Sequence, residues 1–361
     1  MVLGVVLLIA TTVAAVSEND NTAYIDLPSS SVDEVQQQQQ QVNCPQLGDV
    51  VRSHVQAAFG ADRLVTAGLL RIFFHDCFPQ GCDASILLGN EFVGERRKNA
   101  RETIANQGLQ DGALQLIERI RQKVHEDSRC RASVSCADIL ALATRDAVNL
   151  AGGPKYEVPL GRRDSMGPAQ DWQIGLLPKP FDSVGTQINS FRNRGFNEND
   201  LVALSGAHTV GHARCGAFSD RTNNPGNDGF AWHLKNMCAA NKDWKQQLDG
   251  TPANFDNRYF NDLREKRGVL TSDVELAKDD SPVKWLVDGF ARDENWFKWQ
   301  FGESMKKLGN LNWRTQNVDG EIRTRSCFTT NSGSFFTTTH VDDLNTPTDD
   351  DDDEGLLAAA A

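Results

Sequence analysis

Apolar residues recur at helical rather than strand spacing along most of the chain. In residues 50–59, 114–124 and 139–147 the apolar side chains stand mostly three or four positions apart, which is the period of one buried helix face. The pattern therefore predicts a mainly α-helical protein. Clusters of Gly and Pro predict the loops between the helices, at residues 152–154, 178–180 and 224–226.

The two ends of the chain depart from this pattern. Residues 1–16 are almost entirely apolar, long enough for a signal peptide but too short to span a bilayer comfortably, although a buried first helix has a similar composition. A polar leader that contains a run of Gln follows over residues 17–43. Residues 329–361 are first rich in Ser and Thr and then carry five consecutive Asp residues, which predicts a disordered acidic tail. The folded domain is thus expected over residues 44–328.

The net negative charge of the chain is concentrated at those two ends. The chain has 361 residues, 39% of them hydrophobic and 24% charged, and a formal net charge of −12. Thirteen of the 49 acids lie in residues 1–43 and 329–361, which hold no Lys or Arg, so 36 acids face 37 bases in the central part. A nearly neutral domain does not favour nucleic acid as a partner, because such binding needs a clustered basic face.

Eight cysteines are spread over the central part of the chain. An even number in an exported chain is typical of a disulfide framework, whereas paired thiolates are also the ligands of structural zinc. The shortest spacings, Cys77 to Cys82 and Cys130 to Cys136, are wider than the usual zinc-binding pair. Spacing alone leaves about 105 disulfide pairings open.

A first candidate for chemistry lies in residues 70–78. Arg71 and His75 are four residues apart in an apolar stretch, so a helix places both on one face. A lone His there is commonly a core residue, but a buried guanidinium beside it is costly unless a ligand or cofactor uses the charge. His can move a proton between the two oxygens of a peroxide while Arg stabilises the leaving oxygen.

A second candidate is His208, at the end of an apolar stretch that finishes in small residues. Small residues let the backbone approach a large flat group, and an imidazole can bind haem iron. A structural histidine and a zinc ligand are the alternatives.

Six motifs together resemble a known family. In order along the chain they match class III secretory plant haem peroxidases, the family of horseradish peroxidase, from about Cys44 to Phe328. Six ordered motifs are far more specific than any one of them. They are residues 74–78, 81–88, 134–142, 158–165, 204–209 and 320–323.

The resemblance implies a two-lobed helical fold with one haem b between a distal and a proximal lobe. It assigns His75 as the distal acid-base group, Arg71 as its electrostatic partner and Phe74 as a wall of the distal pocket. His208 becomes the proximal iron ligand. The remaining assignments are Asn106, which would hydrogen-bond the distal His, Asp273, which would accept the other ring N–H of the ligand, and Pro178, which would border the aromatic-donor site.

The same resemblance implies two calcium sites, and hard cations do favour clustered oxygens on tight loops. The proximal loop is one residue shorter than the family pattern. The distal ligands would be Asp76, Pro79, Gly81, Asp83 and Ser85, and the proximal ones Thr209, Asp249, Thr251, Asn254 and Asp256. The implied disulfides are Cys44–Cys130, Cys77–Cys82, Cys136–Cys327 and Cys215–Cys238.

We therefore expect a secreted, monomeric peroxidase that reduces hydrogen peroxide to water while small phenolic donors give up single electrons. The cell wall or extracellular space is the expected location, with the vacuole as an alternative reached through the tail. A haem-free secreted binding protein is a rival interpretation, which retention of Arg71, His75, His208 and Asp273 disfavours. An intracellular ascorbate-type peroxidase is another, which the signal and the eight cysteines disfavour. The aromatic residues of a helix late in the chain are expected to be packing residues and not part of a substrate site: Trp296, Phe297, Trp299 and Phe301.

Overall fold

The computed structural model describes residues 42–89, 91–93, 96–98, 103–311 and 319–332. All of them belong to one compact unit, Gln40–Ala361. The expected signal peptide, nearly all of the leader and most of the acidic tail lie outside the described residues. The structure therefore leaves those three expectations as predictions.

Helices dominate the described residues, as the apolar spacing predicted. The first group of α-helices is α2 Leu47–Ala61, α3 Val65–Gln80, α4 Asp111–Val124, α5 Ser128–Ser133, α6 Cys136–Leu150 and α7 Asp171–Ile174. The second group is α8 Val184–Asn193, α9 Glu198–Ser205, α10 Ser219–Asn223, α11 Gly229–Ala240, α12 Arg258–Arg264, α13 Thr271–Ala277, α14 Lys284–Arg292 and α15 Glu294–Gly309. Short 3₁₀ helices cover Ser85–Leu87, Ile104–Asn106, Gly206–Thr209 and Cys215–Phe218.

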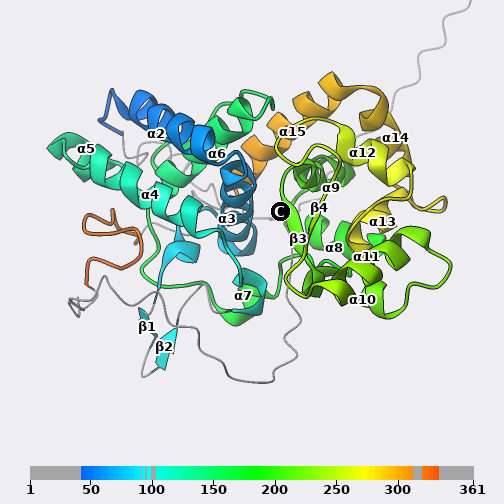
Figure 1. Ribbon diagram of the computed structural model, residues 1–361. Coiled ribbons are helices and arrows are strands. Elements are labelled where there is room, and N and C mark those ends of the chain that lie inside the picture. The colour runs from blue at the N-terminus through cyan, green and yellow to red at the C-terminus, as the bar shows by residue number, and fades with distance from the viewer. Residues whose placement is uncertain (1–41, 90, 94–95, 99–102, 312–318, 333–361) are drawn as a thin grey trace, which may run out of the picture. The chain divides into compact units, whose positions relative to one another are not determined.

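The first group packs around α3. Helices α2 and α3 both contact α6, and α4 contacts α2, α3 and α6 (Figure 1). The three segments predicted from apolar spacing fall in α2, α4 and α6, and their predicted faces are mostly buried, although Val50 and Phe59 of α2 are only partly buried. Helix α6 begins at a capped end, because the Ser135 hydroxyl accepts a hydrogen bond from Asp138 N, which satisfies a backbone donor that the first helical turn leaves open.

The second group packs around α9 and α15. These two helices contact each other, α8 contacts α9, and α12 contacts α13 and α14 (Figure 1). Asn197 and Asp200 form a capping box at the start of α9, while Asp293 caps α15. The contact of α3 with α15 joins the two groups. The expected two-lobed helical architecture is therefore confirmed.

Strands are few and short. β1 Glu91–Val93 pairs antiparallel with β2 Arg96–Lys98, with Glu91 opposite Lys98. β3 His212–Arg214 pairs antiparallel with β4 Lys245–Gln247, with His212 opposite Gln247. β3 comes soon after the 3₁₀ helix that carries His208, so its pairing with β4 holds the chain in place at the end of that helix.

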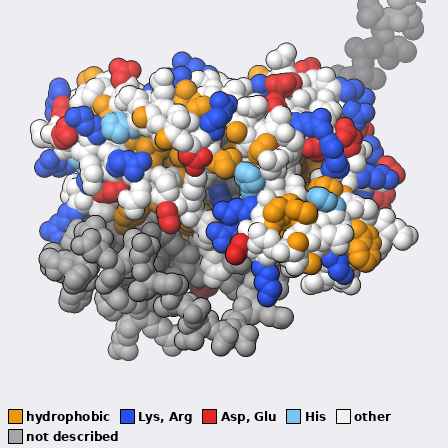
Figure 2. Space-filling model, viewed as in Figure 1, with side chains coloured by type: hydrophobic (Ala, Val, Ile, Leu, Met, Phe, Trp, Pro, Cys, Tyr) orange, Lys and Arg blue, Asp and Glu red, His pale blue; other side chains and the backbone are white. Residues whose placement is uncertain are grey.

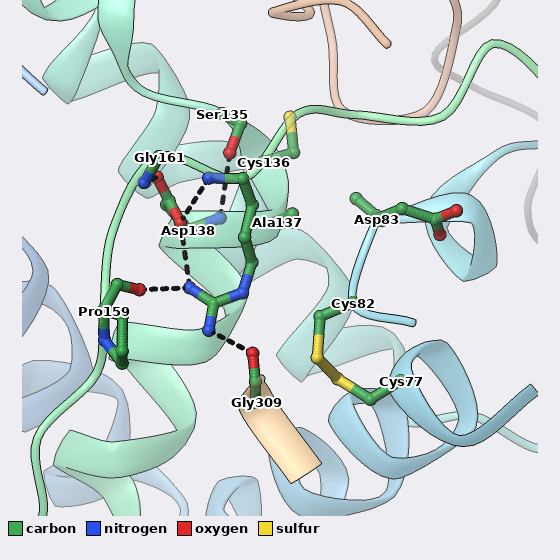
Figure 3. A network of polar contacts seen from close by, with 12 residues as sticks. Cys77, Cys82, Asp83, Ser135, Cys136, Ala137, Asp138, Pro159, Gly161 and Gly309 are labelled. Carbon is green, nitrogen blue, oxygen red and sulfur yellow. Dashed lines mark hydrogen bonds and ion pairs between the residues drawn. A yellow bond between two sulfur atoms is a disulfide. The ribbon is translucent and has the colours of Figure 1, made fainter. Parts of the chain in front are cut away.

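A buried ion pair ties the first group of helices to the end of α15. The Arg162 guanidinium contacts the Asp138 carboxylate at 3.0 Å and donates to the Gly309 carbonyl at 2.6 Å. Figure 3 labels these two partners, Asp138 and Gly309. Both side chains are almost completely buried. Burial raises the pKa of Asp138, and the Arg162 charge acts in the opposite direction. Removal of one partner of a buried charge pair leaves an uncompensated charge, so loss of either residue is expected to destabilise the fold.

Arg323, in the last of the six motifs, is equally buried. It donates to the carbonyls of Ala84 at 2.8 Å, Cys327 at 2.9 Å and Ser165 at 2.7 Å. Its own backbone N–H donates to the Asp164 carboxylate, which also accepts from the backbone at the start of α6. Burial raises the pKa of Asp164 to about 6. Arg323 therefore ties the end of the domain to earlier segments, and these hydrogen bonds include neither His75 nor His208.

The four disulfides join the pairs that the resemblance implied, Cys44–Cys130, Cys77–Cys82, Cys136–Cys327 and Cys215–Cys238. One packing expectation was wrong: Phe297 and Phe301 are buried, but the Trp299 side chain is 60% exposed. In α15 it stands two positions from each of these Phe residues, so it faces away from the buried side. Among the described residues no helix is both long and apolar enough to cross a membrane.

Candidate active site

His75 lies on α3, buried to 4% exposure. Its Nδ1 is 2.9 Å from the amide oxygen of Asn106. An amide oxygen only accepts hydrogen bonds, so Nδ1 carries the proton and Nε2 is the basic nitrogen. That Nε2 is buried and has no hydrogen-bond partner among the described residues, which is unusual for a buried polar atom and marks a place for a ligand.

Electrostatics keep His75 neutral. Burial, assisted by the nearby Arg71 charge, lowers its pKa to about 3, although the hydrogen bond with Asn106 acts in the opposite direction. A neutral imidazole with an available lone pair can accept a proton across the physiological pH range.

Arg71 lies one turn before His75 on α3, as predicted. Its guanidinium donates to the carbonyls of Ala105, Gln107 and Gly108 at 3.0 to 3.2 Å. These carbonyls belong to the same loop that presents Asn106, so one loop orients both partners of the helix. Burial and the Arg214 charge lower the pKa of Arg71 to about 10, which leaves it a cation at neutral pH.

His208 lies in the 3₁₀ helix Gly206–Thr209 and has a different partner. Its Nδ1 is 2.7 Å from a carboxylate oxygen of Asp273, at the start of α13. The carboxylate accepts a hydrogen bond from the N–H at Nδ1, so Nε2 carries the free lone pair of the ring. A carboxylate behind an imidazole fixes its orientation and makes it a stronger ligand. The structure thus brings together the predicted pair His208 and Asp273.

Tyr259 is a member of the site that the sequence analysis missed. Its hydroxyl donates to the Asp273 carboxylate at 2.9 Å, and the Leu270 backbone N–H donates to the other oxygen at 3.1 Å. Burial, together with the Asp273 charge, raises the pKa of Tyr259 well above its usual value, so it remains a hydrogen-bond donor. No sequence signal marks this contact, because it joins α12 to α13 across a loop.

Two cavities border these residues. The inner cavity encloses about 700 Å³ of space free of protein atoms, its opening included, and is lined by His208, Asp273, Phe74 and Pro178 among other, mostly apolar, residues. The outer cavity, of about 1680 Å³, is lined by His75 and Pro178 among others. Phe74 stacks on Phe78 with ring centroids 4.9 Å apart. The segment 178–180 borders both cavities, so the predicted Pro178 does lie beside the two histidines' sites.

The distal loop brings together three of the five residues that the resemblance implied, Asp76, Asp83 and Ser85. Asp76 accepts from the backbone N–H groups of Asp83 and Ala84 at 3.0 and 2.9 Å. Asp83 accepts from Ser85 N at 3.0 Å. Both carboxylates are buried; burial and the Asp83 charge raise the pKa of Asp76, and burial raises that of Asp83. The disulfide Cys77–Cys82 closes the same loop, which also contains Pro79 and Gly81.

The proximal loop brings four of its five predicted residues together. The Thr209 hydroxyl donates to Asp249 at 2.7 Å, and the Thr251 hydroxyl donates to Asp256 at 3.1 Å. Burial raises the pKa of Asp249 to about 7. The side-chain oxygen of Asn254 instead accepts from Arg63 at 3.0 Å. No described cluster has three His, Cys, Asp or Glu side chains arranged for a metal; each loop offers two carboxylates, with hydroxyl and carbonyl oxygens beside them.

Comparison with known proteins agrees with this geometry. A model of the peroxidase family matches residues 51–293, which include Arg71, His75, His208 and Asp273. The chain belongs to the peroxidase family. It is 40% identical over 299 residues to Peroxidase 12 of Arabidopsis thaliana, a match that covers 81% of each chain. It is also 39% identical to Peroxidase 47 of the same plant, over 78% of this chain and 85% of the relative.

The family assignment gives this peroxidase an activity, the reduction of hydrogen peroxide by an electron donor. A third relative, Peroxidase 57 of Arabidopsis thaliana, is 40% identical over 79% of this chain and 89% of its own length. The chain thus spans most of the length of each relative.

Proposed function

We propose that this peroxidase binds one haem b beside His208 and uses hydrogen peroxide to oxidise small phenolic donors. The observation that carries the proposal is the contrast of the two imidazoles. His75 has a buried Nε2 without a partner among the described residues, whereas His208 is held by a carboxylate and lines an apolar cavity. An apolar cavity with one oriented imidazole fits a flat macrocycle bound through its iron.

His208 would ligate the iron through Nε2, with Phe74 and other apolar residues against the ring. The bound haem would supply the electron storage that amino-acid side chains lack. His75 accepts a proton at Nε2 from the entering peroxide and returns it to the departing oxygen, so that water leaves. The Arg71 cation stabilises the negative charge on that oxygen. Asn106 holds the His75 ring so that Nε2 faces the reacting oxygens.

Two calcium ions belong to the proposal as structural cations. Asp76, Asp83 and Ser85, with the carbonyls of Pro79 and Gly81, would hold one of them. The second would lie among Thr209, Asp249, Thr251 and Asp256, with Asn254 on the same loop. Paired carboxylates support both sites, because a cation offsets their repulsion; both are buried in the distal loop, whereas in the proximal loop Asp249 is buried and Asp256 is partly buried. The proximal loop adjoins His208 directly, so a cation there would also stabilise the 3₁₀ helix that carries the ligand.

We also propose export to the cell wall or extracellular space, or to the vacuole through the acidic tail. Four disulfides among the described residues support an oxidising compartment. The apolar residues 1–16 supply the signal.

Absorption spectroscopy tests the central proposal. Purified chain loaded with haem is expected to show a Soret band, to change that band on addition of hydrogen peroxide, and to oxidise guaiacol. Because the pKa of His75 is lowered to about 3, the reaction with peroxide should vary little between pH 5 and 8. A chain that fails to retain haem, or that retains it without any turnover of guaiacol, would overturn the proposal.

A further inference from the structure

Lys179 occupies a distinctive position at the two cavities. Among the described residues it is the one Lys or Arg side chain that lines both the inner and the outer cavity. Its neighbours Pro178 and Pro180 line both as well, and the rigid prolines hold the segment against the openings. On the face drawn in Figure 2, Lys and Arg side chains gather near the middle, beside a hollow.

The ammonium group of Lys179 is available to a ligand. The side chain is exposed, and its Nζ makes no ion pair with any described carboxylate. Its backbone N–H, not its ammonium, binds the carboxylate of Asp182 at 2.8 Å. Nζ lies 5.9 Å from the ring centroid of Phe181, which is 42% exposed. A cation and an exposed aromatic ring therefore stand side by side at the cavity wall.

None of the described carboxylates that line the cavities forms an ion pair with Lys179. Asp171 and Asp220 line the outer cavity but not the inner one, and Asp220 accepts a hydrogen bond from Thr271. Asp273 lines the inner cavity but is held by His208, Tyr259 and the Leu270 backbone. The positive charge at segment 178–180 thus faces the space that a donor would enter.

The cationic side of the site extends toward His75. Arg71 and Arg214 are close enough that the charge of Arg214 lowers the pKa of Arg71. Arg71 thus adds a positive charge beside His75, and Lys179 adds one at the two cavities; positive charge of this kind attracts anions from solution.

We propose that Lys179 binds the carboxylate of an anionic aromatic donor, so that the enzyme prefers hydroxycinnamate-type acids to neutral phenols of the same ring. This proposal rests on the proposed function and narrows its substrate class. The planar ring of such an acid can contact Phe181 and Pro178 while its carboxylate meets the ammonium. An exposed ion pair of this kind changes affinity by a few fold and weakens as salt screens it.

The test compares two donors that share one ring, ferulate and the neutral coniferyl alcohol. Steady-state rates are measured with haem-loaded wild type, Lys179→Gln and Lys179→Arg. Lys242→Gln is the matched control, because Lys242 is exposed and lines neither cavity. Lys179→Gln is expected to raise KM for ferulate about three- to fivefold and to leave KM for coniferyl alcohol unchanged. Lys179→Arg and Lys242→Gln should resemble wild type, and 0.5 M salt should abolish the difference.

A binding arm separates this proposal from the proposed function. Equilibrium dialysis measures ferulate binding to the same haem-loaded proteins without peroxide, and it decides the matter even if neither donor is turned over. Weaker ferulate binding to Lys179→Gln alone supports the proposal. Equal effects on both donors would overturn it. A lower haem content in Lys179→Gln would also overturn it, because the cation would then act on the cofactor.

Discussion

The two histidines of this peroxidase have the same side chain and opposite neighbours. His75 on α3 bonds to a neutral amide, Asn106, and stands beside the Arg71 cation. His208 bonds to an anion, Asp273, which two further donors hold in place. The amide leaves a weak base that remains neutral, while the carboxylate increases the electron density of its imidazole. In the proposed function, environment rather than residue type would therefore separate proton transfer at His75 from iron binding at His208.

The largest effects are expected when each histidine is replaced by alanine, because the two variants should lose different properties. We expect His75→Ala to retain haem and to react with peroxide about 10²- to 10⁴-fold more slowly, since a catalytic acid-base group is lost. His208→Ala should lose haem instead. Stopped-flow kinetics and the ratio of Soret to protein absorbance measure the two effects. Loss of haem from His75→Ala would contradict the division of roles.

Exchange of the two partners should sharpen the comparison with a smaller effect. Asn106→Asp places an anion behind His75 and should raise its pKa, so that the acid limb of the pH–rate profile moves to higher pH. Asp273→Asn removes the anion behind His208 and should weaken haem retention or activity about 10- to 100-fold.

Reduction potential distinguishes the two exchanges. Asp273→Asn should raise the potential of the haem iron, because a less basic ligand stabilises the oxidised iron less well. Asn106→Asp should move it much less. Equal shifts in the two variants would show that the identity of the partner does not matter.

Removal of calcium tests the cation sites proposed in the distal and proximal loops, through the melting temperature. Chelation should lower the melting temperature of the wild type by several degrees, since each lost cation leaves paired carboxylates in repulsion. Asp249→Ala should reduce this response by removing the proximal site. A thermal scan with and without chelator is the measurement, and an identical melting temperature in both scans would rule out bound calcium.

The smallest expected effect concerns two residues other than glycine that have a positive φ. They are Ala84 in the distal loop, at 56°, and Lys266 after α12, at 58°. Glycine adopts this conformation without strain. Lys266→Gly should raise the free energy of unfolding by about 0.5–1 kcal/mol, as urea unfolding can measure. Ala84→Gly should not, because its fully buried methyl group would be lost. Destabilisation by Lys266→Gly would show that the backbone there is unstrained.

Local spacing predicted the helices and the shared face of Arg71 and His75, because a helix repeats every few residues. Family motifs supplied what spacing could not, such as the partners of each cysteine and of each histidine. The contacts that were missed join residues distant in the chain or in different elements, as Tyr259 does with Asp273 and Arg63 with Asn254. Such contacts depend on tertiary packing, which neither helical periodicity nor a short motif encodes. The position of Lys179 at both cavities likewise depends on tertiary packing.

The burial of Arg323 has a consequence for biosynthesis. Its guanidinium satisfies carbonyls at Ala84, Ser165 and Cys327, and its backbone binds the buried Asp164. While the chain emerges from the ribosome, the helices around His75 are complete long before residue 323 appears, and those buried acceptors then lack their partner. The earlier half of the enzyme thus reaches its final state only after synthesis is almost finished. A message truncated shortly before this arginine would encode both histidines and still yield a chain that quality control can recognise as unfinished.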